Sequence, residues 1–408
     1  MATCSLCLRD PAPWIGALLL LVWWSGHSLA AETAVTPTLE LRQEYTDNFF
    51  YRPAGRIGTI VTRVSPWIKA AAKTELLSVS LAARHSLLRY SNPGIKDDQE
   101  QVYEGTGSYR LTPRLKFSGS AAYRREAWPD REIELSGQAL NLTSRRQNYG
   151  AGAQYQISEL TLGTLGYGNE QTSYSDNSRS SDLATHNVSA AFQHDADRWL
   201  SLLKLRGAAS FSRSDYTTTQ TEIENYQLTL GASWRLHELW SVSADAGGRY
   251  TRSGFLAAPL APPPGLAARR EVSDSKGVVF KTSLDYGGEW LTGSLAYSRD
   301  LNTSSGQFGT AVERDALTFS LNRRLAYELF AVAGGGYYRS KADSNQFGSQ
   351  PVDETSWRGS LSLRYQLSPD WAADLGYDHF RRSTDSPGSS AYRNKVFFQV
   401  TGQTSFFE

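Results

Sequence analysis

The sequence predicts an all-β protein, a single antiparallel transmembrane β-barrel of about 18 strands with short periplasmic turns and long extracellular loops. Three observations predict it. Apolar and polar residues alternate in segment after segment, which is the period of β-strands. These segments are roughly 10 to 13 residues long, which exceeds the usual strand and suits a tilted crossing of a bilayer. The breaks between them are short and long in turn, as in bacterial outer-membrane barrels. A soluble all-β solenoid is the alternative fold.

The N-terminus has the features of a secretory signal peptide. Arg9 precedes an apolar run over residues 14–24, and small residues suit cleavage after Ala30. We therefore expect a cleaved signal peptide at 1–30 and one barrel domain at 31–408. An uncleaved membrane anchor is the alternative interpretation of the same run.

The composition excludes several other classes of protein. With 42 Lys+Arg against 41 Asp+Glu, the chain lacks the basic excess of nucleic-acid-binding proteins, so no nucleic-acid partner is expected. Beyond the N-terminus no apolar run of about 18 residues occurs, which excludes a bundle of transmembrane helices. Cys4, Cys7 and the only methionine precede the expected cleavage. The mature chain would therefore hold neither disulfides nor a cysteine zinc site.

The alternation places the strands along the chain. Between Tyr226 and Leu236, for example, every second residue is apolar or aromatic and the others are polar or small. Residues 160–171 change parity, which predicts a β-bulge there. Strands are expected to begin near residues 38, 58, 76, 101, 114, 147, 160, 186, 199, 223, 239, 277, 290, 315, 329, 356, 371 and 392. Short turns are expected at Ala70–Lys73, Thr112–Pro113, Ser158–Glu159, Asp195–Asp197, His237–Glu238, Gly287–Gly288, Ala326–Tyr327 and Ser368–Asp370. The long connections include residues 126–146, Pro259–Gly265, 301–314, 341–355 and 382–391.

A short motif precedes four of these turns and consists of an aromatic, a polar and an aliphatic residue. Its copies lie about 40 residues, or a small multiple of that, apart, as expected for one hairpin pair per repeat. An aromatic ring at the end of a transmembrane strand is typical of the girdle at the lipid headgroups. The motif occurs as Tyr109-Arg110-Leu111, Tyr155-Gln156-Ile157, Trp234-Arg235-Leu236 and Tyr365-Gln366-Leu367. The predicted girdle comprises Tyr109, Tyr155, Trp199, Trp234, Trp240, Trp290, Tyr365 and Trp371.

The strand parity also predicts the lining of the lumen. A barrel of about 18 strands is wide enough for an aqueous channel unless an outer loop folds inward. Basic residues predominate among the inward candidates, so we expect a net basic lumen that favours anionic solutes or polymers. The alternative is that the arginines pair with lumen acids and stiffen the wall. The predicted pore-lining residues are Arg42, Arg63, Arg84, Lys116, Arg124, Lys204, Arg206, Arg235, Arg249, Lys281, Arg324, Arg364, Asp245, Asp285 and Asp374.

The sequence contains no catalytic or metal-binding motif that we recognise. The histidines lack zinc-ligand spacing, and neither a nucleophile elbow nor a phosphate-binding glycine loop occurs. Asp378 and His379 are the only pair that could suggest a catalytic site, and the alternation puts them on opposite faces of one strand. We therefore predict no enzyme activity, no catalytic residues, no bound metal and no cofactor.

The first predicted strand carries a family-like motif, Tyr45-Thr46-Asp47-Asn48. The segment Thr36–Phe50, followed by Val64–Ile68, resembles the opening of the beta-barrel porin 2 family, whose members include proteins associated with exosortase and exopolysaccharide gene clusters. The resemblance implies an outer-membrane protein that serves polysaccharide secretion, and it supplies no catalytic residues. Taken from the residues alone, Asp47 and Asn48 are expected to bind loop backbone at the end of the strand, with ion or glycan binding as the alternative.

Together these observations predict a porin-like channel in the outer membrane of a Gram-negative bacterium, linked by the resemblance to exopolysaccharide export. The alternative is a non-conducting structural barrel that acts as the scaffold of a polysaccharide or protein secretion system. The expected partners are outer-membrane lipid and the barrel-assembly machinery during insertion. The resemblance adds polysaccharide and periplasmic export components to these partners.

Overall fold

The structure is a computed structural model that describes residues 32–126, 143–175, 181–257, 269–303, 311–344, 346–347, 351–384 and 390–406. The signal peptide expected at 1–30, most of the connection expected at 126–146 and all of Pro259–Gly265 lie outside the described residues. Within those ranges the chain forms 18 β-strands and no helix. Accordingly, no helix in the described part is long and apolar enough to cross a membrane.

The strands follow one another along the chain with short gaps. Their bounds are β1 (Glu32–Thr46), β2 (Thr59–Lys73), β3 (Leu77–Tyr90), β4 (Asp98–Thr112), β5 (Leu115–Glu126), β6 (Ser144–Ser158), β7 (Thr161–Tyr174), β8 (Leu183–Asp195), β9 (Leu203–Tyr216), β10 (Thr221–His237), β11 (Trp240–Ala257), β12 (Arg269–Gly287), β13 (Leu291–Asn302), β14 (Val312–Arg324), β15 (Leu329–Ala342), β16 (Val352–Ser368), β17 (Trp371–Thr384) and β18 (Ala391–Gln403).

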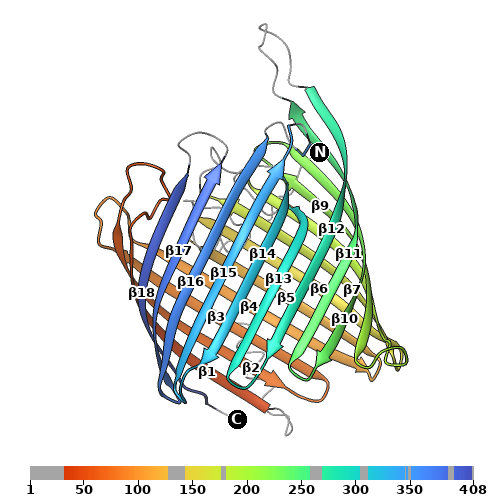
Figure 1. Cartoon of the computed structure of the whole chain (residues 1–408), viewed down its shortest axis with the longest axis horizontal. Helices are drawn as coiled ribbons and strands as arrows, with labels where there is room; N and C mark the ends of the chain where they lie inside the picture. The colour runs from red at the N-terminus through yellow and green to blue at the C-terminus, as the bar shows by residue number, and fades with distance from the viewer. Residues whose placement is uncertain are drawn as a thin grey trace, which may run out of the picture.

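The 18 described strands form one closed antiparallel barrel, which confirms the predicted fold class. Each strand pairs with the next in sequence, and β1 also pairs with β18 from Thr38 and Gln403 to Thr46 and Lys395. The strands run at a steep tilt around the barrel (Figure 1). Because the barrel is closed, no edge strand among those described is free to pair with another chain and cause aggregation. An open sheet of this width would have such edges.

The two ends of the barrel differ, and we call them the turn end and the loop end. Eight hairpins close at the turn end, where β1 also begins and β18 ends. The loop end carries the other connections, most of them longer. The predicted alternation fails at one place, because β9 and β10 join at the loop end through residues 217–220 alone. Gln220 has a positive φ of 50° there, as tight hairpin connections require.

Some predicted boundaries were wrong by several residues. The turn expected at Ala70–Lys73 still belongs to β2, and the chain reverses at residues 74–76. Because alanines occupy both faces of the strand here, the alternation between polar and apolar residues is absent and could not mark the strand end. Strand β12 begins at Arg269 rather than near 277, because its polar upper half resembles a loop in sequence. The strands are also longer than predicted, from 12 residues in β5 to 19 in β12.

The repeated motif marks bulged turns. In all four copies the strand register shifts just before the turn, for example between Gln156 and Ser158 and between Gln366 and Ser368. Gln156 Nε2 donates to Ser158 O at 2.6 Å, and Gln366 Nε2 donates to Ser368 O at 2.6 Å. In these two copies the polar residue of the motif, a glutamine, thus stabilises the turn. The bulge predicted within 160–171 is wrong, because β7 pairs with β8 in unbroken register and the shift in its pairing with β6 lies at Gln156.

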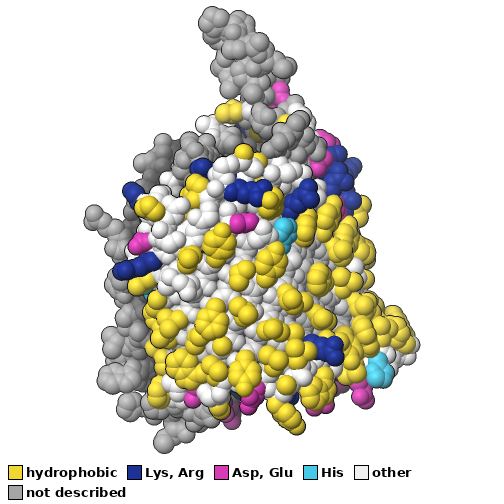
Figure 2. Space-filling model, turned by 60° about the vertical axis from the view of Figure 1, so that its left-hand side comes forward, with side chains coloured by type: hydrophobic (Ala, Val, Ile, Leu, Met, Phe, Trp, Pro, Cys, Tyr) yellow, Lys and Arg dark blue, Asp and Glu magenta, His cyan; other side chains and the backbone are white. Residues whose placement is uncertain are grey.

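The outer face of the barrel is apolar and exposed. Leu228 and Leu230, in the middle of β10, expose 61 % and 62 % of their surface, and they alternate with inward polar residues such as Thr229. Figure 2 shows apolar side chains spread over most of the visible wall, with charged side chains gathered toward the two ends. So large an exposed apolar surface marks an interaction site, and its belt shape matches a lipid-facing wall.

The predicted strand-end motif ties the first strand to the last. Asn48 is fully buried, and its Nδ2 donates to Arg52 O and Tyr392 O at 2.8 Å each, while its Oδ1 accepts from Arg52 N at 2.9 Å. Asp47 accepts hydrogen bonds from the backbone and side-chain nitrogens of Asn394, at 2.7 Å and 2.6 Å. These contacts join the β1–β2 connection to β18 across the closing seam of the barrel.

We expect Asn48→Ala to weaken this seam. The change leaves Tyr392 O without its side-chain partner in a buried place, which costs about 1–3 kcal/mol of folding free energy. The measurement is urea unfolding of the detergent-folded barrel, followed by loss of the compact form on gels. Asn92→Ala is the matched control, because Asn92 Oδ1 accepts from Gly94 N in an exposed turn. Equal stability of the two variants would contradict a role for Asn48 in closure.

Candidate channel lumen

The inward face of the barrel carries the residues that were predicted to line the pore. Strand register places all 15 of them opposite the exposed apolar side chains; Arg42 and Arg63, for instance, are direct partners on β1 and β2. The 15 do not form one cluster. They are spread over β1, β2, β3, β5, β9, β10, β11, β12, β14, β16 and β17.

Most of the predicted basic residues are paired with acids. Eight of the 12 lie within 4.0 Å of a carboxylate, including Arg206 and Asp245 at 2.8 Å and Arg364 and Asp374 at 2.7 Å. Within the described residues, four have no such acid partner. These are Arg84, Lys116, Arg235 and Arg324. The ion-paired wall that the sequence left as an alternative therefore describes most of the lumen, and any excess of positive charge is local.

A cavity of the described interior lies between β1–β5 and β16–β18. Its volume is about 490 Å³, which falls within the usual 300–1,000 Å³ of small-molecule sites. It is lined by Arg42, Glu44, Arg63, Trp67, Ala82, Arg84, Glu100, Val102, Glu104, Arg124, Glu126, Arg358, Ser360, Leu361, Ser362, Asp378, Lys395 and Phe397.

Ion pairs hold the walls of this cavity. Arg42 lies 3.1 Å from Glu44, and its guanidinium stacks on the Phe397 ring at 3.9 Å. Lys395 lies 3.0 Å from Asp378. Further pairs join Arg63 to Glu100 at 3.3 Å, Arg358 to Asp378 at 3.6 Å, and Arg124 to Glu104. Because both partners of each pair come from a strand, the wall is rigid and its charge is largely neutralised.

Described residues of the loop-end connections send side chains into the barrel. From the β1–β2 connection, Phe49 packs on the inward residues Val61 and Leu88, and Tyr51 packs on Phe380 with ring centroids 5.2 Å apart. From the β15–β16 connection, Phe347 enters a second cluster. This inner loop cluster comprises Leu183, Tyr216, Ile223, Ala311, Val312, Ala342, Phe347 and Val352. The sequence predicted an open lumen unless a loop folds inward, and described residues of these connections do pack inside the barrel.

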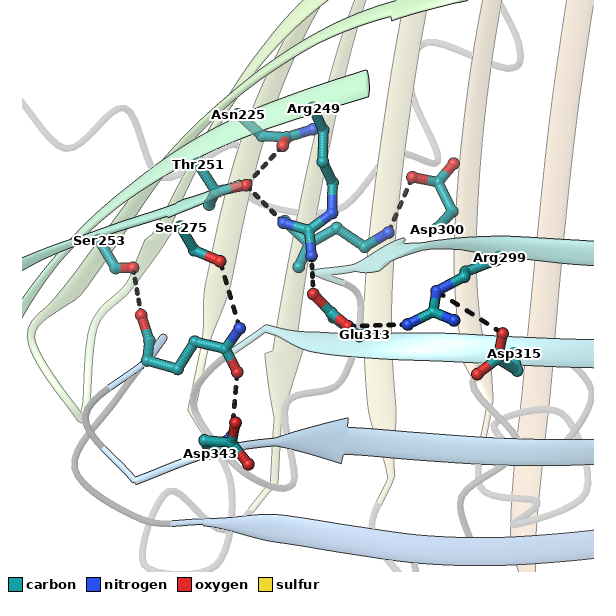
Figure 3. Close-up of polar contacts among 12 residues, drawn as sticks. Asn225, Arg249, Thr251, Ser253, Ser275, Arg299, Asp300, Glu313, Asp315 and Asp343 are labelled. Atoms are coloured by element: carbon teal, nitrogen blue, oxygen red, sulfur yellow. Dashed lines mark hydrogen bonds and ion pairs between the residues drawn. The ribbon is translucent and has the colours of Figure 1, made fainter. Parts of the chain in front are cut away.

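A polar network surrounds the inner loop cluster (Figure 3). Arg249 donates to Thr251 Oγ1 at 2.9 Å and is paired with Glu313, so β11 is tied to the tip of β14. Arg299 lies 3.5 Å from the same Glu313 carboxylate. Ser253 Oγ donates to Gln346 O at 2.9 Å, next to Phe347. These contacts hold Gln346 and Phe347 of the β15–β16 connection against the wall.

The residues predicted to form an aromatic girdle lie at the turn end. Trp240 and Trp371 open β11 and β17, and Trp199 and Trp290 lie in the turns themselves. Seven of the eight residues are exposed, and Trp234 is half-buried. The full set is Tyr109, Tyr155, Trp199, Trp234, Trp240, Trp290, Tyr365 and Trp371.

Asp378 and His379 lie on opposite faces of β17. Asp378 points inward to Lys395, whereas the His379 ring lies outside on Trp357, with centroids 4.6 Å apart, and contacts Asn394 Oδ1 at 2.7 Å. They therefore do not share a site. Within the described ranges, no three His, Cys, Asp or Glu side chains come together as a metal site.

Two residues important for the lumen were missed in the sequence. Trp67 faces inward and lines the cavity, although it is aromatic. Its position between Ser65 and Lys69 in the period-2 pattern could have revealed its inward parity. Phe347 lies in a connection, where no periodicity exists to indicate that it packs inside.

Comparisons with known proteins show no family for this chain. No family model and no curated protein matches the chain. The solved structures that align along the barrel include the following three. The outer membrane protein opdK from Pseudomonas aeruginosa is 11 % identical, with a TM-score of 0.48 over 91 % of this chain and 99 % of that one. OccAB1 of Acinetobacter baumannii is 12 % identical, with a TM-score of 0.49 over 92 % and 97 %. OpdL of Pseudomonas aeruginosa is 12 % identical, with a TM-score of 0.47 over 92 % and 99 %.

Proposed function

We propose that this chain is an outer-membrane channel for hydrophilic solutes. The observation that carries the proposal is a closed 18-stranded barrel, in its described part, with an exposed apolar wall outside and charged and hydroxyl side chains inside. Such a barrel satisfies its backbone hydrogen bonds within the wall, as a membrane-spanning sheet must. Its interior is wide enough for water and small solutes.

The test is planar-bilayer conductance of the refolded mature chain under a salt gradient. We expect discrete steps whose size is below that of an unobstructed barrel of this width, because described residues of the loop-end connections pack inside the mouth. A folded, heat-modifiable barrel that never conducts would contradict the channel. It would favour the second candidate, a structural barrel that holds a secretion complex at the outer membrane. The inward-packed Phe49, Tyr51 and Phe347 are the observation in favour of that candidate.

We further propose a weak preference for anions, set by the basic side chains that lack acid partners. Lys116 and Arg235 lie inward near the turn end and are exposed. Paired charges cancel at a distance, so unpaired ones dominate the field in the lumen.

We expect the double variant Lys116→Gln, Arg235→Gln to lower the anion-to-cation permeability ratio by about twofold, because it removes unpaired positive charge from the lumen. The reversal potential under a salt gradient measures this ratio. Arg323→Gln is the matched control, since Arg323 faces outward on β14. If neither variant changes the anion-to-cation permeability ratio, Lys116 and Arg235 are not the origin of the anion preference.

The link to exopolysaccharide export rests on the resemblance of the first strand, from Thr36 to Phe50, and is kept as a proposal. Alginate, an acidic polysaccharide, is a suitable probe. If the lumen admits such chains, alginate oligomers added to one side of the bilayer interrupt the current for resolvable times. If the current is not interrupted at saturating alginate, the lumen does not admit the polymer. The link to polysaccharide export would then be wrong, and only the proposal of a channel for small solutes would remain.

A further inference from the structure

The cavity is lined by an exposed aromatic side chain, and exposed aromatic side chains elsewhere in the described strands lie on the outer face of the barrel. Trp67 faces inward on β2 and exposes 41 % of its surface. Among the aromatic residues of the described strands that are exposed to this degree, the others face outward. An apolar indole gains free energy when it is buried, whereas the Trp67 indole is exposed in the aqueous lumen. We therefore interpret its exposed face as a surface that binds a ligand.

The residue beside Trp67 is a cation without an ion pair. Arg84 on β3 is the register partner of Trp67, so the two side chains stand next to each other on one face of the sheet. Both line the cavity. Arg84 makes no ion pair within 4.0 Å in the described chain, and its buried Nε has no hydrogen-bond partner there.

The other cations of the cavity are neutralised. Arg42, Arg63, Arg124, Arg358 and Lys395 each lie against a carboxylate. The carboxylate of Glu100, near Arg84, is held by Arg63. Arg84 is thus the one cation among the described lining residues that is left to bind an anion, and a guanidinium binds a carboxylate through parallel hydrogen bonds.

We propose that this cavity is a binding subsite for a cyclic organic monoanion, with the carboxylate on the Arg84 guanidinium and the ring face on the Trp67 indole. The ring belongs either to a sugar acid or to an aromatic acid, and both present one carboxylate and one flat face. A cavity of about 490 Å³ accommodates such a molecule with its water. The proposal deepens the proposed channel function, because the ligand would reach the cavity through the lumen.

The test is isothermal titration calorimetry of the detergent-folded mature chain with sodium glucuronate, sodium benzoate and glucose. Binding does not require conductance, so failure of this proposal and failure of the channel are distinguishable. We expect at least one acid to bind about tenfold more tightly than glucose. The tighter acid identifies the source of the ring. Absence of heat from both acids would overturn the proposal.

Variants then assign the two roles. Arg84→Gln should weaken acid binding about tenfold, whereas Arg84→Lys, which keeps the charge, should weaken it less. Trp67→Ala should weaken binding of the acid, and Trp67→Phe should retain most of it. Arg323→Gln is the matched control, because Arg323 faces outward on β14 and lies outside the cavity. Unchanged affinity in folded Arg84→Gln, or an equal loss in Arg323→Gln, would overturn the assignment. If Arg84→Gln does not fold, Arg84→Lys and Trp67→Ala decide.

Discussion

Replacing Leu230 by arginine should prevent most of the chain from folding into lipid vesicles. Leu230 lies in the middle of β10 and exposes 62 % of its surface on the apolar outer face. A charged side chain on the lipid face near the bilayer midplane costs about 2–4 kcal/mol, and less near the headgroups. The measurement is the folded fraction in vesicles across a urea series, read from the compact band on gels.

Thr229→Arg is the matched control for this prediction. Thr229 is the neighbouring residue on the same strand and points into the lumen, where a long charged side chain can remain hydrated. We expect this variant to fold like the parent chain. Equal folding of the two variants would mean that the apolar face does not contact lipid, and the proposed membrane location would be wrong.

Replacing Phe347 by alanine should open the mouth of the barrel. Phe347 is completely buried in the inner loop cluster, and truncating such a phenylalanine costs about 3–5 kcal/mol of local packing. Gln346 and Phe347 are held inside by this side chain and by hydrogen bonds between Gln346 and Ser253 and Ser275, so we expect these two residues to leave the lumen more often in the variant. Single-channel conductance should rise about twofold or more as the obstruction is relieved.

Phe319→Ala separates this effect from a general loss of packing. Phe319 lies on the outer face of β14 and exposes half of its side chain, so its truncation removes similar volume away from the lumen. Its conductance should match that of the parent chain. If Phe347→Ala conducts no better than Phe319→Ala while both fold, the inner loop cluster is not what limits the flow.

The alternation between polar and apolar residues predicted the strand number, the barrel and the inward set of charges. It could do so because a period of two puts every other side chain on the same face, whatever the neighbouring strand is. It located the ends of strands poorly where this contrast is absent, as at Ala70–Ala72 and in the polar upper half of β12. The glycines of β7 made its parity ambiguous for the same reason, so a bulge was predicted where none exists.

The sequence by itself therefore determined the architecture of this protein and the inward direction of the charges named above as predicted pore-lining residues. Only the tertiary structure decided which charges are free. Arg364 and Arg84 are alike in sequence, yet one meets Asp374 on the next strand and the other stands beside Trp67 without an ion pair. The inward packing of Phe49 and Phe347 also appeared only in three dimensions. The physical reason is that pairing and loop packing depend on register and on contacts between residues far apart in the chain, which local periodicity does not encode.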